Sequence, residues 1–289
     1  MDKINIKKRY HKPYELILYA LGLAILLLIV TVLIAYIFGF RYFKVETADG
    51  TIKFVGRVNG SGTLESGTLY YSDGKTGKID SSSSKITYSD GSVYEGVLVD
   101  LQKSGKGKIT YENGDTYEGE FEKDKISGNG EYAFENGDIY EGEFKNGKKH
   151  GFGKYIFASD GSYYEGSFVD DSKNGNGVFV LADGSKYEGT YVNDVKNGLG
   201  KLTFANGDVY EGEFVSDVRS GNGKYTWANG DVYEGEFYNN LMHGWGKYTW
   251  AEGRIYEGVF ENGVIVRIDT PESPDEPSTD EPSTETPQQ

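Results

Sequence analysis

The side chains in this sequence that could do chemistry are a few histidines and many carboxylates. The chain holds three histidines and no cysteine, which excludes disulfides and thiolate metal sites. His150 and His243 each stand directly before a Gly-x-Gly. The same position elsewhere holds Ser104, Ser127, Asn174, Asn197 and Ser220. Neither histidine has a serine nucleophile or a metal-ligand spacing, so we expect a loop-closing position and no catalytic or metal site.

The carboxylates form a periodic row. Its members are Glu95, Glu118, Glu141, Glu165, Glu188, Glu211, Glu234 and Glu257, widened by Glu120, Glu143, Glu213 and Glu236. Such a row could bind cations or a basic partner, or it could simply keep an exposed sheet soluble, and we favour solubility. Carboxylate pairs for glycoside hydrolysis can be drawn anywhere along it, so no single pair identifies an active site. We expect no enzyme and no cofactor.

The elements that position these side chains repeat with a fixed period. Tyr-Glu-Gly occurs eight times, starting at Tyr94, Tyr117, Tyr140, Tyr164, Tyr187, Tyr210, Tyr233 and Tyr256. The starts are 23 residues apart except for one step of 24, and each full unit carries Gly-x-Gly. A fixed period of this length predicts a stack of small units, each leaning on its neighbour. Seven full units and a truncated eighth span residues 94–268.

Each unit alternates with period two in both of its arms, which predicts a β-hairpin. Tyr225 and Trp227 share a face of the first arm, and Tyr233 and Phe237 share a face of the second. A two-residue Asn-Gly loop would place these ring sets on opposite faces. A three-residue loop with a left-handed Gly230 pairs Tyr225 with Tyr233 and keeps all rings together, so we prefer it. The extra residue of the fourth unit falls in 158–161, where a longer turn or bulge can absorb it.

Three units break the pattern between their paired glycines. That position is usually Lys or Asn, but it is Phe152, Leu199 and Trp245 in these units. Alternation places these side chains on the glutamate face, away from the rings. Met242, His243 and Trp245 form the most anchor-like cluster, although local packing explains the cluster equally well. We therefore name Phe152, Leu199, Met242, His243 and Trp245 as candidate partner-binding residues.

The N-terminal part carries an apolar run. Residues 16–40 contain no charge, and 25 helical residues span about 37 Å, enough to cross a bilayer. A cleavable signal peptide would have a shorter run and a small-x-small site, so we expect an uncleaved transmembrane helix contacting the lipid bilayer. Residues 1–15 form a short basic segment with Lys3, Lys7, Lys8, Arg9 and Lys12. The charge bias predicts a cell-membrane protein with a cytoplasmic N-terminus and extracytoplasmic repeats.

The remaining segments flank the repeats. Residues 41–93 are expected to be a connector with degenerate capping repeats, and residues 269–289 a disordered acidic tail rich in Pro, Ser, Thr and Glu. The net charge is −15, and the array carries 18 basic against 30 acidic residues. Such a surface repels the phosphate backbone, so nucleic acid is excluded as a partner.

Tyr-Glu-Gly-x-Phe followed by Gly-x-Gly-x-Tyr-x-Trp, at 23 residues, resembles the MORN (membrane occupation and recognition nexus) repeat. The resemblance implies an all-β fold, an elongated single-layer array of stacked antiparallel β-hairpins, here preceded by one transmembrane α-helix. It also implies scaffolding and self-association, so a homodimer is possible. Some members attach the repeats to kinase or methyltransferase domains, for which this chain has no room. We expect a membrane-anchored scaffold that binds an unidentified protein; the alternative is a receptor for a cell-surface or cell-wall glycan.

Overall fold

A computed structural model describes residues 13–80 and 85–266. The expected basic segment up to residue 12, the serine run 81–84 and the expected acidic tail lie outside the described residues. The chain divides into two compact units, Met1–Gln102 and Lys103–Gln289. Each unit is considered by itself.

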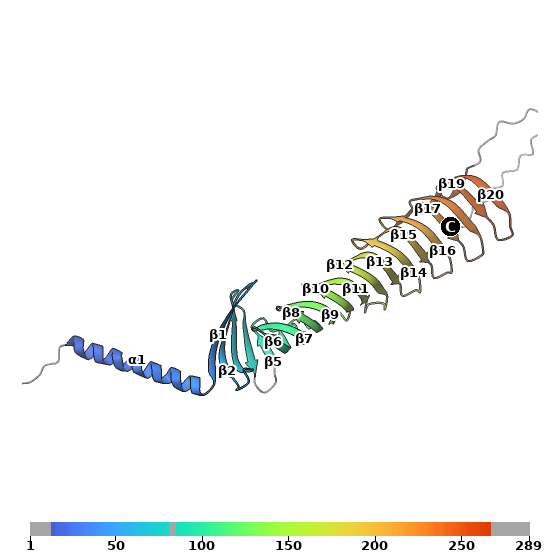
Figure 1. Ribbon diagram of the computed structural model, residues 1–289. Helices are drawn as coiled ribbons and strands as arrows, with labels where there is room; N and C mark the ends of the chain where they lie inside the picture. The colour runs from blue at the N-terminus through green and yellow to red at the C-terminus, as the bar shows by residue number, and fades with distance from the viewer. Residues whose placement is uncertain (1–12, 81–84, 267–289) are drawn as a thin grey trace, which may run out of the picture. The chain divides into compact units, whose positions relative to one another are not determined.

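The first element is a helix, α1 (Pro13–Ile37; Figure 1). Its large apolar side chains are exposed. Its first residue is a proline, which suits the first turn of a helix because that turn needs no backbone donor there. Residues 14–37 are long and apolar enough to cross a membrane, and a signal sequence would share these properties. Arg41 folds back on the helix end, donating to the Tyr36 carbonyl at 2.7 Å.

The rest of the described chain is one antiparallel sheet of 21 strands. Within each unit, successive strands pair through hairpins (Figure 1). The expectation of a single-layer all-β array is thereby confirmed. The strands are β1 (Phe40–Thr47), β2 (Gly50–Val58), β3 (Leu64–Tyr71), β4 (Thr76–Asp80), β5 (Lys85–Tyr88), β6 (Val93–Val99), β7 (Gln102–Thr110), β8 (Thr116–Glu122), β9 (Lys125–Ala133), β10 (Ile139–Lys145), β11 (Lys148–Ile156), β12 (Tyr163–Val169), β13 (Ser172–Val180), β14 (Lys186–Val192), β15 (Val195–Thr203), β16 (Val209–Val215), β17 (Val218–Thr226), β18 (Val232–Tyr238), β19 (Leu241–Thr249), β20 (Ile255–Glu261) and β21 (Val264–Ile265).

The turn inside each repeat is the three-residue loop that the sequence predicts. In β17 and β18, Tyr225 lies opposite Tyr233 and Gly223 opposite Gly235. Gly230 has a φ of 98°, a left-handed value that favours glycine. The repeated rings of the two arms therefore share one face, called the ring face below, and the glutamates occupy the other, called the outer face. In the unit that starts at Tyr140 the extra residue lengthens the turn, since the Gly161 amide donates to the Phe157 carbonyl four residues back.

A second, two-residue turn joins each repeat to the next. Asn239 and Asn240 both have positive φ, 48° and 70°, which is the type I′ geometry. The expected loop-closing position of the histidines directly before Gly-x-Gly is wrong, because the turn lies further from the Gly-x-Gly. His150 and His243 instead lie within β11 and β19. The two-residue turns precede these strands, at Asn146-Gly147 and Asn239-Asn240, because Asn and Gly tolerate the left-handed region of φ.

A β-bulge in the six repeats that start at Tyr117 to Tyr233 explains the first glycine of Gly-x-Gly. The register between β16 and β17 shifts between Gly212 and Phe214, and Gly221 takes a left-handed φ of 70° opposite the shift. The bulge exposes a backbone carbonyl, to which the repeat tyrosine donates: Tyr210 Oη lies 3.0 Å from the Glu213 oxygen. The Glu213 carboxylate in turn accepts from the Asn222 amide at 3.0 Å.

The core of the array is a row of rings over glycines. Tyr233 is fully buried and meets Phe237 of its own strand and Phe260 of the next repeat edge-on, at 5.2 and 4.9 Å. The same tyrosine lies over Gly235 and Gly246, where an added Cβ would meet its ring. A single sheet has no second layer, so ring-on-glycine contact replaces the usual core.

Candidate functional site

The outer face carries the exposed apolar residues that the sequence singles out. Phe152, Leu199 and Trp245 are 57%, 71% and 56% exposed. Their cross-strand neighbours are Ser167, Glu213 and Val259. The Phe152 amide donates to Glu143 at 2.9 Å and the Trp245 amide to Glu236 at 3.2 Å, which fixes the backbone beneath both side chains.

Met242 and His243 do not form one patch with Trp245. Met242 is 4% exposed and lies opposite Phe237 on the ring face. Strand alternation therefore directs it away from His243, and we remove Met242 from the surface candidates. His243 is half-buried, with its ring centroid 5.6 Å from that of Tyr238. Two residues of the expected cluster, His243 and Trp245, remain on the outer face.

The glutamate row of the outer face is largely a row of ion pairs. Each pair joins a Tyr-Glu-Gly glutamate to a lysine of the preceding strand. The pairs are Lys108–Glu118, Lys154–Glu165, Lys201–Glu211 and Lys224–Glu234, at 3.3, 3.6, 2.6 and 3.0 Å. Exposed pairs of this kind contribute about 0–1 kcal/mol each, so they keep the face soluble more than they stabilise it. Among residues 13–80 and 85–266, no cluster of three or more His, Asp or Glu could hold a metal ion.

The ring face carries a row of cations that the sequence analysis missed. Lys103, Lys149, Lys173, Lys196 and Arg219 each stand two residues before the first glycine of Gly-x-Gly. The charged ends of Lys149, Lys173, Lys196 and Arg219 lie over aromatic rings; Lys196 Nζ, for example, is 5.1 Å from the Tyr187 centroid. Burial lowers the pKa of Lys149 and of Lys173 from the usual lysine value. The recurrence of a basic residue at this position was the available signal.

Each cation of this row meets the second residue of the turn one repeat further on. The Lys103 amide donates to Asp124 at 2.9 Å, Lys149 to Asp171 at 2.9 Å, Lys173 to Asp194 at 2.8 Å and Lys196 to Asp217 at 2.9 Å. Where the row holds an apolar residue instead, Ile126 and Met242, the turn holds a glycine, Gly147 and Gly263. The amide of that glycine donates to the carbonyl of the apolar residue. Adjacent repeats are thus matched in charge and size.

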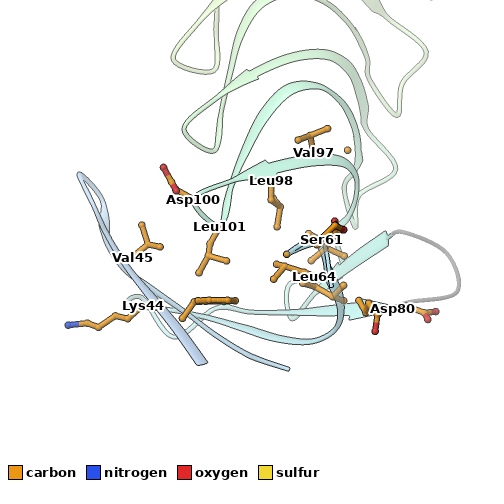
Figure 2. A pocket seen from close by; sticks show the side chains of 16 residues that line it. Lys44, Val45, Ser61, Leu64, Asp80, Val97, Leu98, Asp100 and Leu101 are labelled. Carbon is orange, nitrogen blue, oxygen red and sulfur yellow. The ribbon is translucent and has the colours of Figure 1, made fainter. Parts of the chain in front are cut away.

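The first compact unit contains a cavity that the sequence did not indicate. Residues 41–93 were expected to be worn repeats and a connector, but β1 to β6 enclose a hollow of about 860 Å³. Figure 2 shows Val45, Leu64, Leu98 and Leu101 around it, with Asp80 and Asp100 at its margin. The lining combines apolar side chains with charged ones such as Lys44 and Glu65.

The chemistry of the described residues is that of a binding surface. Burial raises the pKa of Tyr210 and of Tyr187 to about 12, which keeps their hydroxyls protonated as donors to backbone carbonyls. The histidines do not face a nucleophile: His150 and His243 lie in strands whose neighbours are the glutamates and glycines of the bulge. These features define a class, the repeat proteins whose units stack into a continuous sheet.

The family follows from a comparison with protein-family models. The MORN repeat model matches residues 94–116, 117–139, 140–162, 164–186, 187–209, 210–232 and 233–253. These matches cover more than half of the sequence, and the chain belongs to the MORN repeat family. The predicted family is therefore confirmed.

Other comparisons add little beyond this. No curated protein matches the chain. Among solved structures, it is similar to the SAS-4 (dCPAP) TCP domain of Drosophila melanogaster in complex with a proline-rich motif of Ana2 (dSTIL), with 18% identity over 61% of this chain and 89% of that one and a TM-score of 0.35. The TCP10 domain of Danio rerio CPAP with a STIL peptide gives 11% identity, 76% and 100% coverage and a TM-score of 0.38. A streptogramin B lyase gives 12% identity, 78% and 85% coverage and a TM-score of 0.17. Scores this low carry no argument about function.

Proposed function

We propose that this protein is a non-enzymatic scaffold, held at the membrane by α1, that binds a protein partner through the outer face of its MORN array. The observation that carries the proposal is the exposure of Leu199 and Trp245 on that face. The equivalent position is polar in other repeats, as at Asn222. A large apolar side chain on a fixed backbone, surrounded by polar residues, is the usual anchor of a protein interface.

Anchoring by α1 rests on its length and composition. An apolar helix exposed on all sides is costly in water, and a bilayer removes that cost. Arg41 follows the helix, with its guanidinium carbon 3.8 Å from the centroid of the Tyr36 ring. An arginine and a tyrosine at this point suit the interface between lipid and water.

The exposed residues support glycan binding less than they support protein binding. Stacking on a sugar needs exposed ring faces, but Tyr225, Trp227 and Tyr248 are buried in the ring row. Trp245 alone offers a large exposed indole among the residues discussed, so glycan binding becomes an outcome of the test below.

The test is crosslinking of the full-length protein in its native membrane, followed by identification of the attached proteins. We expect the Trp245→Ala variant to lose most of the crosslinked partner, because truncating an anchor costs about 2 kcal/mol or more of binding free energy. Asn222→Ala changes the same position one repeat earlier and is the matched control. It should crosslink as the native chain does.

Two results would contradict the proposal. One is an unchanged crosslinking pattern in a variant that combines Leu199→Ala with Trp245→Ala and keeps its circular dichroism. The other is retention of the native protein on isolated envelope polymer with no crosslinked protein, which would favour the glycan alternative. A crosslink only to a second copy of this chain would make self-association the function of the surface.

A further inference from the structure

One repeat departs from the charge matching of the ring face. Lys103, Lys149, Lys173 and Lys196 each face an aspartate of the next turn, but Arg219 faces Asn240. The Arg219 Nη2 donates to the Asn240 carbonyl at 2.8 Å, and its Nε lies 3.4 Å from the Asn240 side-chain oxygen. Both of these acceptors are neutral. Arg219 is therefore the member of the row that meets no carboxylate at its turn.

The cost of that arrangement is raised by burial. The Arg219 guanidinium lies over four rings, with its carbon 5.2 Å from the Tyr225 centroid and 5.5 Å from that of Tyr210. Burial lowers the pKa of Arg219, which shows that the surroundings disfavour its charge. Asp208 is linked to it only through Tyr225, whose hydroxyl donates to Asp208 at 2.8 Å. Arg219 is half-buried, and a guanidinium that is partly withdrawn from water and has no carboxylate beside it favours an acceptor that supplies the charge.

A second donor without an acceptor lies in the same place. Trp227 is 8% exposed, and its indole N–H has no partner among the residues that the structure describes. The corresponding residues of the preceding repeats are Phe157, Leu181 and Phe204, which have no donor to satisfy. Trp227 packs on Tyr225 with ring centroids 4.5 Å apart, which holds the indole beside Arg219.

These two donors line one cavity. It measures about 130 Å³ and is bounded by Arg219, Tyr225, Trp227, Phe237, the Asn240 turn and Met242. In the next repeat the cation row ends, because Met242 replaces the lysine. A cation without a carboxylate partner and a tryptophan whose indole N–H has no acceptor thus line one open space on the ring face.

We propose that this cavity binds a carboxylate group, with the Arg219 guanidinium and the Trp227 indole N–H as its donors. An arginine fork with a neighbouring N–H suits the two oxygens of a carboxylate, and the surrounding rings exclude water. The site is separate from the outer-face anchor residues and goes beyond the function proposed above.

Two sources can deliver the carboxylate. One is a free small acid from solution. The other is the acidic tail after residue 269, which carries Glu272, Asp275, Glu276, Asp280, Glu281 and Glu285. The described chain ends just after β21, which pairs with β20 and, through it, with β19 of the cavity. The distance from β21 to the cavity is a few strand spacings of ~4.8 Å each. The 23 residues that follow residue 266 are long enough to span it.

The test uses the full-length chain in detergent micelles with ¹⁵N-labelled tryptophan, which gives three indole resonances. Sodium acetate is compared with sodium chloride at equal ionic strength. Acetate should shift the Trp227 resonance to lower field in a saturable way, while those of Trp245 and Trp250 stay in place. Substituting Trp227→Phe assigns the resonance.

Two variants sharpen the result. Asn240→Asp supplies the carboxylate that other repeats carry at this turn, so the acetate response should be lost while circular dichroism is unchanged. A chain with the six tail acids changed to Asn or Gln distinguishes the sources. If acetate shifts the Trp227 resonance in this variant but not in the native chain, the tail occupies the site. If acetate shifts it in both chains, the site is open to free acids.

Three outcomes would overturn the proposal. The first is an absence of response in both the native and the tail-neutralised chains. The second is an equal shift of all three indoles, which would mean a general salt effect. The third is an undiminished response in Asn240→Asp, which would show that the missing counter-ion of Arg219 is irrelevant.

Discussion

At the scale of the residue, the repeat rests on a contact between a tyrosine ring and a glycine. Tyr-Glu-Gly supplies the ring, and the second glycine of Gly-x-Gly supplies the space beneath it. The tyrosine hydroxyl then satisfies the carbonyl that the bulge exposes, with Tyr117 Oη at 2.9 Å from the Glu120 oxygen and Tyr233 Oη at 2.9 Å from that of Glu236. The tyrosine therefore has two roles: its ring packs on the glycine and its hydroxyl binds the bulge carbonyl. Phenylalanine would keep the packing but leave that carbonyl unpaired.

Gly223→Ala should therefore destabilise the array. An added Cβ would lie 2.6 Å from the Tyr210 ring, and the ring cannot move because its hydroxyl is held by the bulge. Overpacking of this kind costs ~3 kcal/mol, to be measured by urea unfolding of the full chain. Gly60→Ala is the control, because the space around Gly60 is open and its φ is ordinary. Equal stability of the two variants would contradict the ring-on-glycine account.

At the scale of the element, neighbouring hairpins recognise each other through matched side chains. Where one repeat has an aspartate two residues before its repeat tyrosine, the next has a tyrosine that donates to it, as Tyr132 does to Asp115 and Tyr248 to Asp231. Where the first has Ser162 or Ser185, the next has Phe179 or Leu202, which carry no hydroxyl. The aspartate also accepts a backbone amide of the next turn, and Ser185 Oγ performs the same task for Ala205 at 3.1 Å.

A double-mutant cycle on Asp208 and Tyr225 tests this matching. Asp208→Ser alone should cost about 1–3 kcal/mol, because it leaves the buried Tyr225 hydroxyl without its acceptor. Adding Tyr225→Phe recreates the Ser–Phe pair of the earlier repeats and should recover ~1 kcal/mol or more. The control pairs Asp208→Ser with Tyr248→Phe, whose partner is Asp231. Additivity in both cycles would show that the pairing is incidental.

The same aspartates predict how stability depends on pH. Burial alone would raise the pKa of Asp208, but hydrogen bonds from the Ala228 amide and Tyr225 outweigh it and hold the pKa below 3.8. The folded pKa is depressed, so the stabilisation is complete above the unfolded pKa and is lost as pH falls through the folded value. Unfolding free energy should therefore fall below about pH 4, and Asp208→Ser should flatten that fall. An equal slope in both chains would refute this.

Sequence reasoning reached the intra-repeat hairpin because only one loop length keeps Tyr225 and Tyr233 on one face. It missed the two-residue turns because Lys123-Asp124 or Ser216-Asp217 look like ordinary polar strand ends until the bulge is known. The outer position of Trp245 and the burial of Met242 both follow from alternation, since they are three positions apart, and the bulge at Gly244 preserves that alternation. Grouping the two residues in one surface cluster was therefore wrong. The cavity of β1 to β6 depends on contacts between residues far apart in sequence, so the sequence repeat could not predict it.

At the scale of the whole molecule, the chain combines an apolar helix with a repeat array of net charge about −12. These two parts fit one protein if the helix holds the array beside a membrane without the array adhering to it. An acidic array is repelled by anionic headgroups, so the anchor and not the repeats would supply membrane contact. Tethering of the repeats to the bilayer would then raise their effective concentration toward membrane-bound partners.

The orientation of the helix decides which partners are within reach, and a chain without cysteine allows it to be measured. Five basic residues precede the helix, against Arg41 and Lys44 just after it, so the repeats should face away from the cytoplasm. Asn222→Cys, on the exposed outer face, should react with an impermeant maleimide added to intact cells. Lys7→Cys should react only after permeabilisation and serves as the control. The opposite labelling pattern would place the array in the cytoplasm, and a Lys7→Cys protein found soluble and shortened would mean that the helix is a cleaved signal.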